Sequence, residues 1–166
     1  MKLRKNFNQL NWINKHLNLG TKKKNIKSTL MFTLFWNLFE HETCYDWFNI
    51  NTIRDLINRA NLSIYEFIEY YDYFKKRYTI NGDINERFET LNFRNQTDRE
   101  YVRNTFRNPT PSNEELISSL FLVIQRLRNN IFHGLKEIST LEIQEPNFNI
   151  ANKAIATFLE LTKRNY

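Results

Sequence analysis

The sequence predicts an all-α fold, a bundle of about four to six helices with up-down packing. Apolar residues recur at spacings of three and four along most of the 166-residue chain, which is the period of an amphipathic helix. Glycine and proline number only three each, so the sequence holds few of the turn signals that a strand-rich fold needs. The length suits a single domain over residues 1–166, and the aromatic content of 15% predicts an aromatic-rich core.

The first two predicted helices span about residues 7–17 and 27–42. Gly20 is expected to end the first helix. A basic loop should follow, either binding phosphate or serving as a solvated connector: Lys22, Lys23, Lys24 and Lys27. The second helix carries two adjacent apolar rows and should be deeply buried: Leu30, Leu34 and Leu38, with Met31, Phe35 and Phe39 beside them.

Two further helices are predicted at about residues 51–61 and 63–78. Asn51 and Ser63 are the expected N-terminal caps, and Glu66 would complete a capping box with Ser63. The tyrosine-rich run at residues 70–73 could stack on bases, but aromatic residues at helical spacing are more typical of a core. The expected inward residues are Ile53, Leu56, Ile57, Ile64, Phe67, Ile68, Tyr71, Phe74 and Tyr78.

Residues 79–112 match no pattern that we can name and form a possible insertion. The dipeptide Asn81-Gly82 predicts a tight turn, and residues 97–106 predict an amphipathic helix. The next helix should begin at Ser112 or Asn113 and bury one stripe: Leu116, Leu120, Val123, Leu127 and Ile131. The last helix is expected to follow Pro146 and to run from about residue 150 to 163, with an inward stripe of Ile150, Ala154, Phe158 and Leu161.

The end of the predicted helix at residues 113–133 holds the side chains best suited to catalysis or ligand binding: Arg128, Asn129, Asn130 and His133. Asn129 lies four residues before His133 and Arg126 lies seven before it, so these three side chains share one face. Arg128 and His133 are five residues apart, about 140° around an ideal helix. These two side chains can therefore converge only on something bound beside the helix end, and a phosphate fits that description.

This run resembles the signature of the HEPN superfamily, in which an Arg, a polar residue, three further positions and a His lie near the end of a long helix. Arg128, Asn129 and His133 match that pattern, and the aromatic run at residues 30–40 is similar to an early helix of such domains. The resemblance implies a HEPN-like helical bundle and a metal-independent endoribonuclease that acts as a homodimer, with Arg128 and His133 catalytic. It also implies a toxin or phage-defence effector, with a cognate antitoxin or regulator as a possible partner.

The chemistry of RNA agrees with these roles. A ribose 2′-hydroxyl can attack the adjacent phosphate without metal or other cofactor, leaving a 2′,3′-cyclic phosphate. His133 suits general acid–base catalysis because an unperturbed His has a pKa of about 6.5. Arg128 can stabilise the charge that develops on the phosphate, and Asn129 can orient the imidazole. Arg126 and Lys136 are candidates for gripping flanking phosphates, and a symmetric dimer would supply the second His that acid and base on opposite sides require.

Three other interpretations stay open from the sequence. Arg128 can be a surface residue and His133 a cap at the helix end. A non-catalytic module of the same fold would bind nucleotide, RNA or a protein partner through the basic helix end. A purely structural helical protein would carry its charge for solubility alone.

Charge and composition indicate which partners and which cellular compartment to expect. The net charge of +6 and the pI of about 9.4 favour an anionic partner such as RNA, although solvated lysines explain the charge equally well. The single Cys44 excludes an intramolecular disulfide, suits a reducing cytoplasm and should pack as a small apolar residue. His16 and His41 show no metal-ligand spacing. The longest apolar run, residues 30–39, is about half the length of a membrane-spanning helix, so we expect a cytoplasmic protein with no metal and no membrane span.

Overall fold

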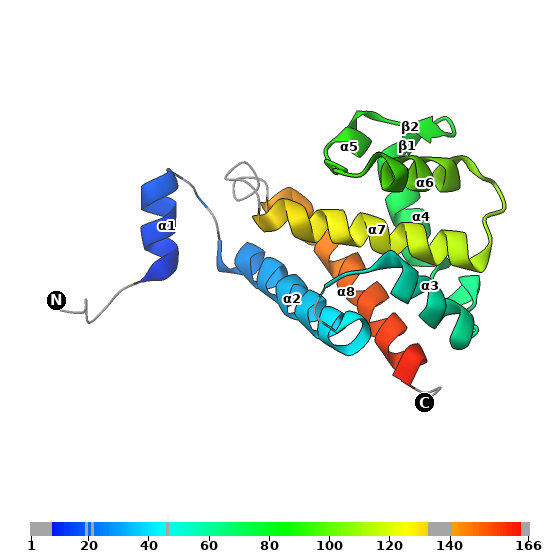
Figure 1. The fold of residues 1–166 in the computed structure, drawn as a ribbon. Coiled ribbons are helices and arrows are strands. Elements are labelled where there is room, and N and C mark those ends of the chain that lie inside the picture. The colour runs from blue at the N-terminus through cyan, green and yellow to red at the C-terminus, as the bar shows by residue number, and fades with distance from the viewer. Residues whose placement is uncertain (1–7, 19, 21, 46, 133–140, 164–166) are drawn as a thin grey trace.

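The computed structural model describes residues 8–18, 20, 22–45, 47–132 and 141–163, and over these residues the protein is built almost wholly of helices (Figure 1). The all-α prediction is confirmed. The α-helices are α1 (Gln9–Leu17), α2 (Lys23–Phe39), α3 (Ile50–Arg59), α4 (Ile68–Tyr78), α5 (Glu86–Glu89), α6 (Gln96–Arg107), α7 (Asn113–Phe132) and α8 (Leu141–Lys163). A π-helical turn (Glu40–Cys44), a 3₁₀ turn (Ile64–Glu66) and a hairpin of β1 (Thr79–Ile80) and β2 (Asp83–Ile84) complete the described elements.

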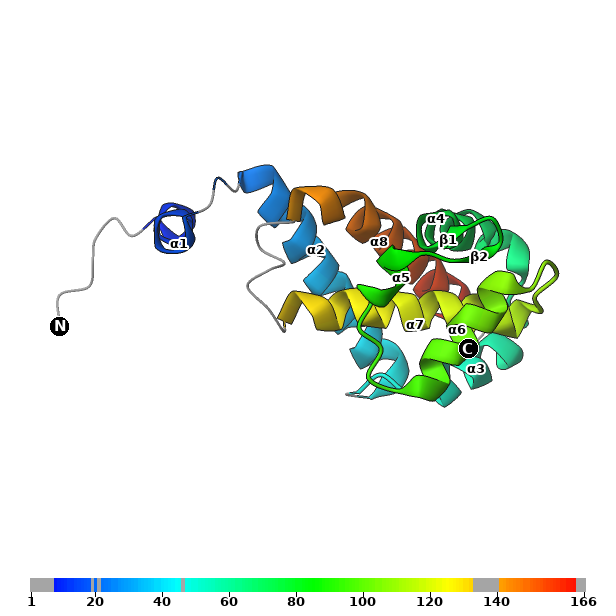
Figure 2. The same cartoon turned by 90° about the horizontal axis from the view of Figure 1, so that it is seen from above.

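Helix α7 runs through the middle of the bundle and contacts α2, α3, α4 and α6, while α2 packs along α8 (Figures 1 and 2). All residues of α7 from Leu116 to Ile124 are buried, so the helix is enclosed on every side and not only along the predicted stripe. Its start is a capping box in which the Ser112 amide donates to Glu115 Oε2 (2.8 Å) and the Glu115 amide donates to Ser112 Oγ (3.2 Å). The predicted start of this helix is therefore confirmed.

Contacts between aromatic rings join the three longest helices. Phe121 of α7 lies 4.9 Å from Phe39 of α2 and 4.7 Å from Phe158 of α8, measured between ring centres. Phe32 of α2 stacks on Phe148 of α8 at 5.1 Å. The four residues Phe32, Phe39, Phe121 and Phe158 are fully buried. The expected aromatic-rich core is thus present, and it fixes α2 and α8 against α7.

Helix α2 buries a different face from the one that its leucines predict. Phe32, Trp36 and Phe39 point into the core, whereas Leu30 is 55% exposed, Leu34 52% and Leu38 46%. The prediction of deep burial is wrong for this leucine stripe (Leu30, Leu34 and Leu38). Both faces are apolar, and the larger aromatic face takes the core because it buries more surface against α7 and α8.

The predicted helix over residues 63–78 is broken into two parts. Ser63 Oγ accepts from the Tyr65 amide (3.3 Å), and the Ile64 amide donates to Asn113 Oδ1 (3.0 Å), which gives a 3₁₀ turn before α4 begins. Two tyrosines of α4 stabilise the fold, as their spacing predicts. The Tyr71 hydroxyl donates to the Thr105 carbonyl (2.8 Å), and the Tyr73 hydroxyl donates to Asn147 Oδ1 (2.8 Å). Burial also raises the pKa of Tyr71 well above its ordinary value.

Residues 79–112 fold against the core. Asn81 and Gly82 both have positive φ (52° and 83°), the conformation of a tight hairpin turn, and the predicted turn is confirmed. The amphipathic helix predicted at residues 97–106 is α6, and its Val102 and Phe106 are buried. The segment packs on α4 through α5 and on α7 through α6, so it forms part of one wall of the bundle.

Four predicted helix boundaries are wrong. Helix α8 begins nine residues before the expected start and includes Pro146, since Asn147 and Phe148 are buried and hold this first part against α2 and α4. Helix α2 begins at Lys23, so three of the four lysines expected in a basic loop belong to this helix. Helix α1 ends at the left-handed Asn18 before Gly20 is reached. Asn49, and not Asn51, caps α3, whose Ile53, Leu56 and Ile57 are buried as expected.

Within the described ranges, no helix has the length and apolar content to cross a membrane. Helix α1 stands apart from the other helices in both views (Figures 1 and 2).

Truncating Phe158 should unfold the protein far more easily than truncating an exposed aromatic residue. We expect Phe158→Ala to lower the free energy of unfolding by about 3–5 kcal/mol, because it opens a cavity among Phe39, Phe67 and Phe121. Tyr65→Ala is the control, since Tyr65 is 86% exposed and its loss should cost less than about 1 kcal/mol. Urea denaturation measures both, and equal losses would contradict this account of the core.

Candidate active site

The residues of the predicted motif divide at the end of α7. Arg128 and Asn129 lie in its last turns, half-buried. His133 and Lys136, like Gly134, fall outside the residues that the structure describes. The structure therefore describes the Arg128 half of the motif.

Arg128 is held on two sides. Its Nη1 donates to Asn129 Oδ1 at 3.0 Å, and its Nη2 lies 3.7 Å from Glu40 Oε2. The Arg128 side chain is 29% exposed and the Glu40 side chain 13%. The guanidinium is thus oriented by an amide and a carboxylate, on a side chain that remains partly exposed.

Glu40 is a member of this site that the sequence did not reveal. It opens the π-helical turn after α2, and its Oε1 accepts from the Phe48 amide at 3.1 Å. This hydrogen bond leaves the second carboxylate oxygen directed to Arg128. Glu40 is one of 18 acidic residues, and nothing in its local sequence separates it from the others; only the packing of α2 beside α7 brings it to the motif.

Asn129 makes a contact that the sequence did not predict. The sequence favoured an amide that orients His133, whereas the structure shows its oxygen accepting from Arg128. Its amide nitrogen is a donor, which suits either an imidazole nitrogen or a phosphate oxygen. The contact with His133 stays a prediction.

Arg126 lies in a buried environment away from Arg128. It is 6% exposed, and its guanidinium donates from Nε to the Leu91 carbonyl (2.9 Å) and from Nη2 to the Asn92 carbonyl. Burial and the nearby charge of Arg94 lower its pKa. In this arrangement Arg126 ties the connection between α5 and α6 to α7, and phosphate binding by Arg126 stays a prediction without a contact to support it.

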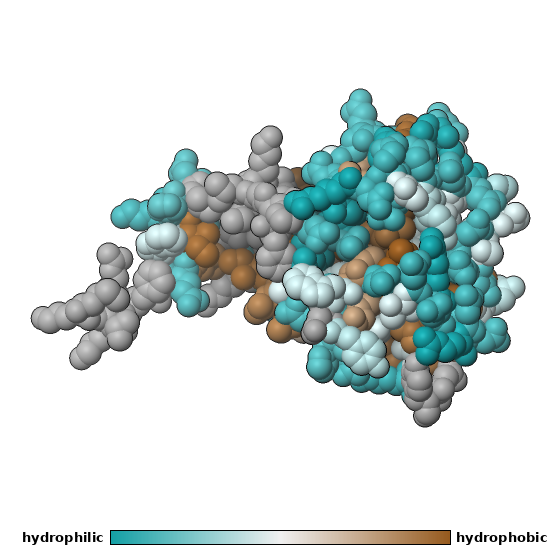
Figure 3. Space-filling model, viewed as in Figure 1, coloured by the Kyte–Doolittle hydropathy of each residue, from teal (hydrophilic) through white to brown (hydrophobic). Residues whose placement is uncertain are grey.

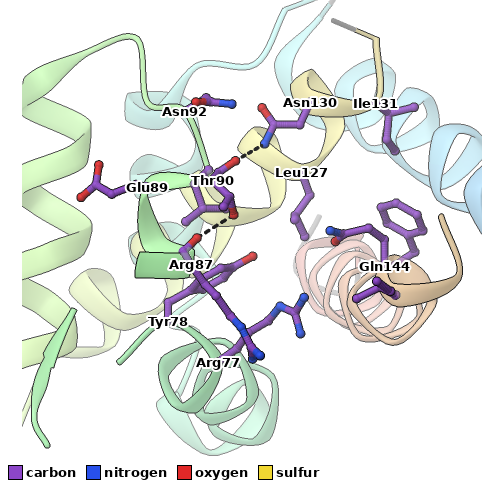
Figure 4. Close-up of a pocket in the computed structure, with 13 residues that line it drawn as sticks. Arg77, Tyr78, Arg87, Glu89, Thr90, Asn92, Leu127, Asn130, Ile131 and Gln144 are labelled. Atoms are coloured by element: carbon purple, nitrogen blue, oxygen red, sulfur yellow. Dashed lines mark hydrogen bonds between the residues drawn. The ribbon is translucent and has the colours of Figure 1, made fainter. Parts of the chain in front are cut away.

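Asn130 supports the same wall. Its Nδ2 donates to the Thr90 carbonyl at 2.8 Å, and the Thr90 hydroxyl donates to the Arg87 carbonyl at 2.6 Å (Figure 4). The end of α7 is therefore anchored to α5 on one side and faces Glu40 on the other. This anchoring limits how far Arg128 can move.

A cavity of about 610 Å³ lies against this end of α7. Its walls come from the end of α4, from α5 and the residues after it, from Leu127, Asn130 and Ile131 of α7, and from the start of α8 (Figure 4). Two arginines, Arg77 and Arg87, line it. The sequence singled out neither arginine as a site residue.

The remaining sequence candidates lie elsewhere. His16 stacks on Trp12 with 4.7 Å between ring centres, and His41 is exposed. Among the side chains that the structure describes, no group of three or more His, Cys, Asp or Glu residues could hold a metal ion. Cys44 is half-buried and lies 3.3 Å from the Thr43 hydroxyl.

Comparison with known proteins found no match: no protein family, curated protein or solved structure is significantly similar to this chain.

The two arginines of α7 should respond differently to the same substitution. Arg126→Gln should lower the free energy of unfolding by roughly 1–3 kcal/mol, because two buried carbonyls lose a charged donor. Arg128→Gln should change it by less than about 1 kcal/mol, since its ion pair is partly exposed. Urea denaturation of both variants measures the difference. A larger effect at position 128 would contradict a structural role for Arg126 and a site role for Arg128.

Proposed function

We propose that this protein is a HEPN-like endoribonuclease that cleaves RNA without a metal and leaves a 2′,3′-cyclic phosphate. The supporting observation is the orientation of Arg128 by Glu40 and Asn129 at the end of a helix that is otherwise buried. A cation held in this way meets an incoming phosphate with little loss of side-chain freedom. The motif resemblance supplies the remaining catalytic group, His133.

In the proposed reaction the 2′-hydroxyl loses its proton and its oxygen attacks the adjacent phosphorus, and the 5′-oxygen of the next nucleotide leaves and takes up a proton. His133 carries out one or both proton transfers. Arg128 presents a planar fork of donors to the non-bridging oxygens and stabilises the added negative charge of the transition state. Asn129 assists by keeping that fork in one orientation.

Glu40 positions Arg128 and also competes with the substrate for it. At 3.7 Å the Glu40–Arg128 ion pair is longer than a direct charged hydrogen bond, so a phosphate can displace the carboxylate at modest cost. Replacing Glu40 by Gln keeps the hydrogen bond to Phe48 possible and removes the competing charge.

The proposed enzyme acts as a homodimer, and the α2 leucine stripe offers the contact surface. Leu30, Leu34 and Leu38 are exposed on successive turns of α2. Figure 3 shows brown, hydrophobic atoms at the surface near the start of this helix. Most of α7 is buried inside its own chain, so two motif helices can meet only near their ends. The stripe ends at Leu38, two residues before Glu40, so the proposed contact surface lies close in sequence to the residue that pairs with Arg128.

The resemblance to the HEPN superfamily also suggests a cellular role for the proposed activity. A cytoplasmic toxin or phage-defence effector, held in check by a cognate antitoxin or another regulator, is the setting in which such an RNA-cleaving activity would be used. The basic charge of the chain agrees with an RNA substrate.

Cleavage should depend on both motif residues. Purified protein incubated in EDTA with a mixed RNA pool should cut it, and Arg128→Ala and His133→Ala should each slow cutting at least about 100-fold. Lys76→Ala is the control, since Lys76 is an exposed cation of α4 outside the site. Full activity of the His133→Ala protein would overturn the mechanism, and so would loss of cutting in the wild type on adding EDTA.

Self-association should depend on the leucine stripe. The wild type should sediment as a dimer, and Leu34→Asp should shift it to monomer and abolish cutting, because the buried contact would hold an unpaired charge. Ile80→Asp changes an equally exposed apolar residue on the hairpin and should leave the dimer intact. A monomeric wild type, or a Leu34→Asp protein that remains dimeric, would contradict the proposed interface.

A further inference from the structure

The cavity beside α7 brings together two arginines, an apolar floor and amide groups (Figure 4). Its volume of about 610 Å³ is that of a site for a small molecule with one or two rings. We propose that it binds a nucleoside monophosphate, either as a free nucleotide or as one residue of an RNA strand. This inference goes beyond the proposed cleavage reaction, because the site would bind its ligand whether or not the chain cuts RNA.

The fold of residues 79–85 brings the two arginines of the cavity together. After the hairpin turn, the Asn85 side chain donates to the carbonyl groups of Arg77 (3.0 Å) and Thr79 (3.3 Å), and its amide donates to the Tyr78 carbonyl (2.9 Å). Asn85 is also the N-terminal cap of α5, through a bond from the Arg87 amide (3.0 Å). One residue thus joins the end of α4 to the start of α5, where Arg77 and Arg87 lie.

The charge of these arginines is available to an anion. Within the described residues no ion pair joins Arg77 or Arg87 to an acidic side chain, and the buried Nε of Arg77 has no hydrogen-bond partner there. Glu89 also lines the cavity, but its Oε1 lies 2.6 Å from Nη2 of Arg99. The local balance at the cavity is therefore positive, which suits a phosphate group.

Tyr78 adds a neutral donor between the two arginines. Burial raises the pKa of Tyr78 to about 12, while Arg77 and Arg87 act in the opposite direction, so the phenol is protonated at neutral pH. Its hydroxyl end points into the cavity in Figure 4, and the guanidinium carbon of Arg77 lies 5.9 Å from its ring centre. The phenol can donate to a phosphate oxygen beside the two guanidinium groups.

The rest of the cavity suits a base. Leu91, Leu127 and Phe148 are buried residues that supply an apolar floor, against which a planar ring can pack. The amide groups of Asn92 and Gln144 also line the cavity and can hydrogen-bond to the edge of a base. An inorganic anion would leave this apolar floor unused, and an apolar molecule would leave the charge of two guanidinium groups unused, so both match the cavity less well than a nucleotide.

Binding should be measured on the full chain carrying His133→Ala, so that cleavage cannot interfere. Calorimetry with the four nucleoside 5′-monophosphates, the matching nucleosides and inorganic phosphate measures the contribution of each part. We expect at least one monophosphate to bind more than tenfold more tightly than its nucleoside or phosphate alone. Arg87→Gln should weaken that binding at least tenfold and Lys76→Gln less than twofold, because Lys76 is an equally charged residue of α4 that does not line the cavity.

A second arm identifies the source of the nucleotide. If a short single-stranded RNA displaces the bound monophosphate, the cavity takes a residue of an RNA strand; if RNA binds without displacing it, the cavity takes free nucleotide. Absence of monophosphate binding, or equal loss in Arg87→Gln and Lys76→Gln, would overturn the inference. Neither result bears on cleavage by Arg128 and His133, so this inference and the proposed function can fail separately.

Discussion

Burial of α7 on every side is the constraint on which the rest of the structure depends. In the enclosed part of α7, the Ser119 hydroxyl donates to the Leu116 carbonyl (2.9 Å), whereas the buried Ser118 hydroxyl has no hydrogen-bond partner within the described residues. The other polar side chains of α7 lie at its two ends, in residues 113–115 and from residue 125 onward. This second group occupies the last turns of the helix. The candidate active site, the cavity and the anchoring bonds of Arg126 and Asn130 all lie there.

The aromatic core fixes the positions of the neighbouring helices relative to α7. Phe39 stacks on Phe121, and the next residue, Glu40, faces Arg128 two turns further along α7. The same core leaves the leucines of α2 in solvent, because the helix has two apolar faces and only one can pack inside the chain. Burial of the aromatic face of α2 therefore positions Glu40 beside Arg128 and also leaves the proposed dimer surface exposed.

Periodicity and caps predicted the helical class, the position of α7 with Ser112 at its start, the hairpin turn at Asn81-Gly82 and the core role of Tyr71. The buried face of α2 could not be predicted in the same way, because its leucines and its aromatic residues both recur at the spacing of a buried helix face. Glu40, Arg77 and Arg87 could not be found because each joins the site through contacts between distant segments. The two arginines of α7 differ for the same reason: Arg126 meets buried carbonyls of residues 91 and 92, and Arg128 meets Glu40.

The central claim is that the end of α7 directs attack by a ribose 2′-hydroxyl, with Arg128 stabilising the phosphate. The most direct test is to locate one cleavage site in a defined RNA oligonucleotide and to compare that strand, in EDTA, with the same strand carrying a single 2′-deoxy residue at the attacking position. The account predicts that the ribose strand is cut to a 2′,3′-cyclic phosphate and that the deoxy strand stays intact at this position. Equal cutting of both strands would contradict it, because no 2′-oxygen would then be needed.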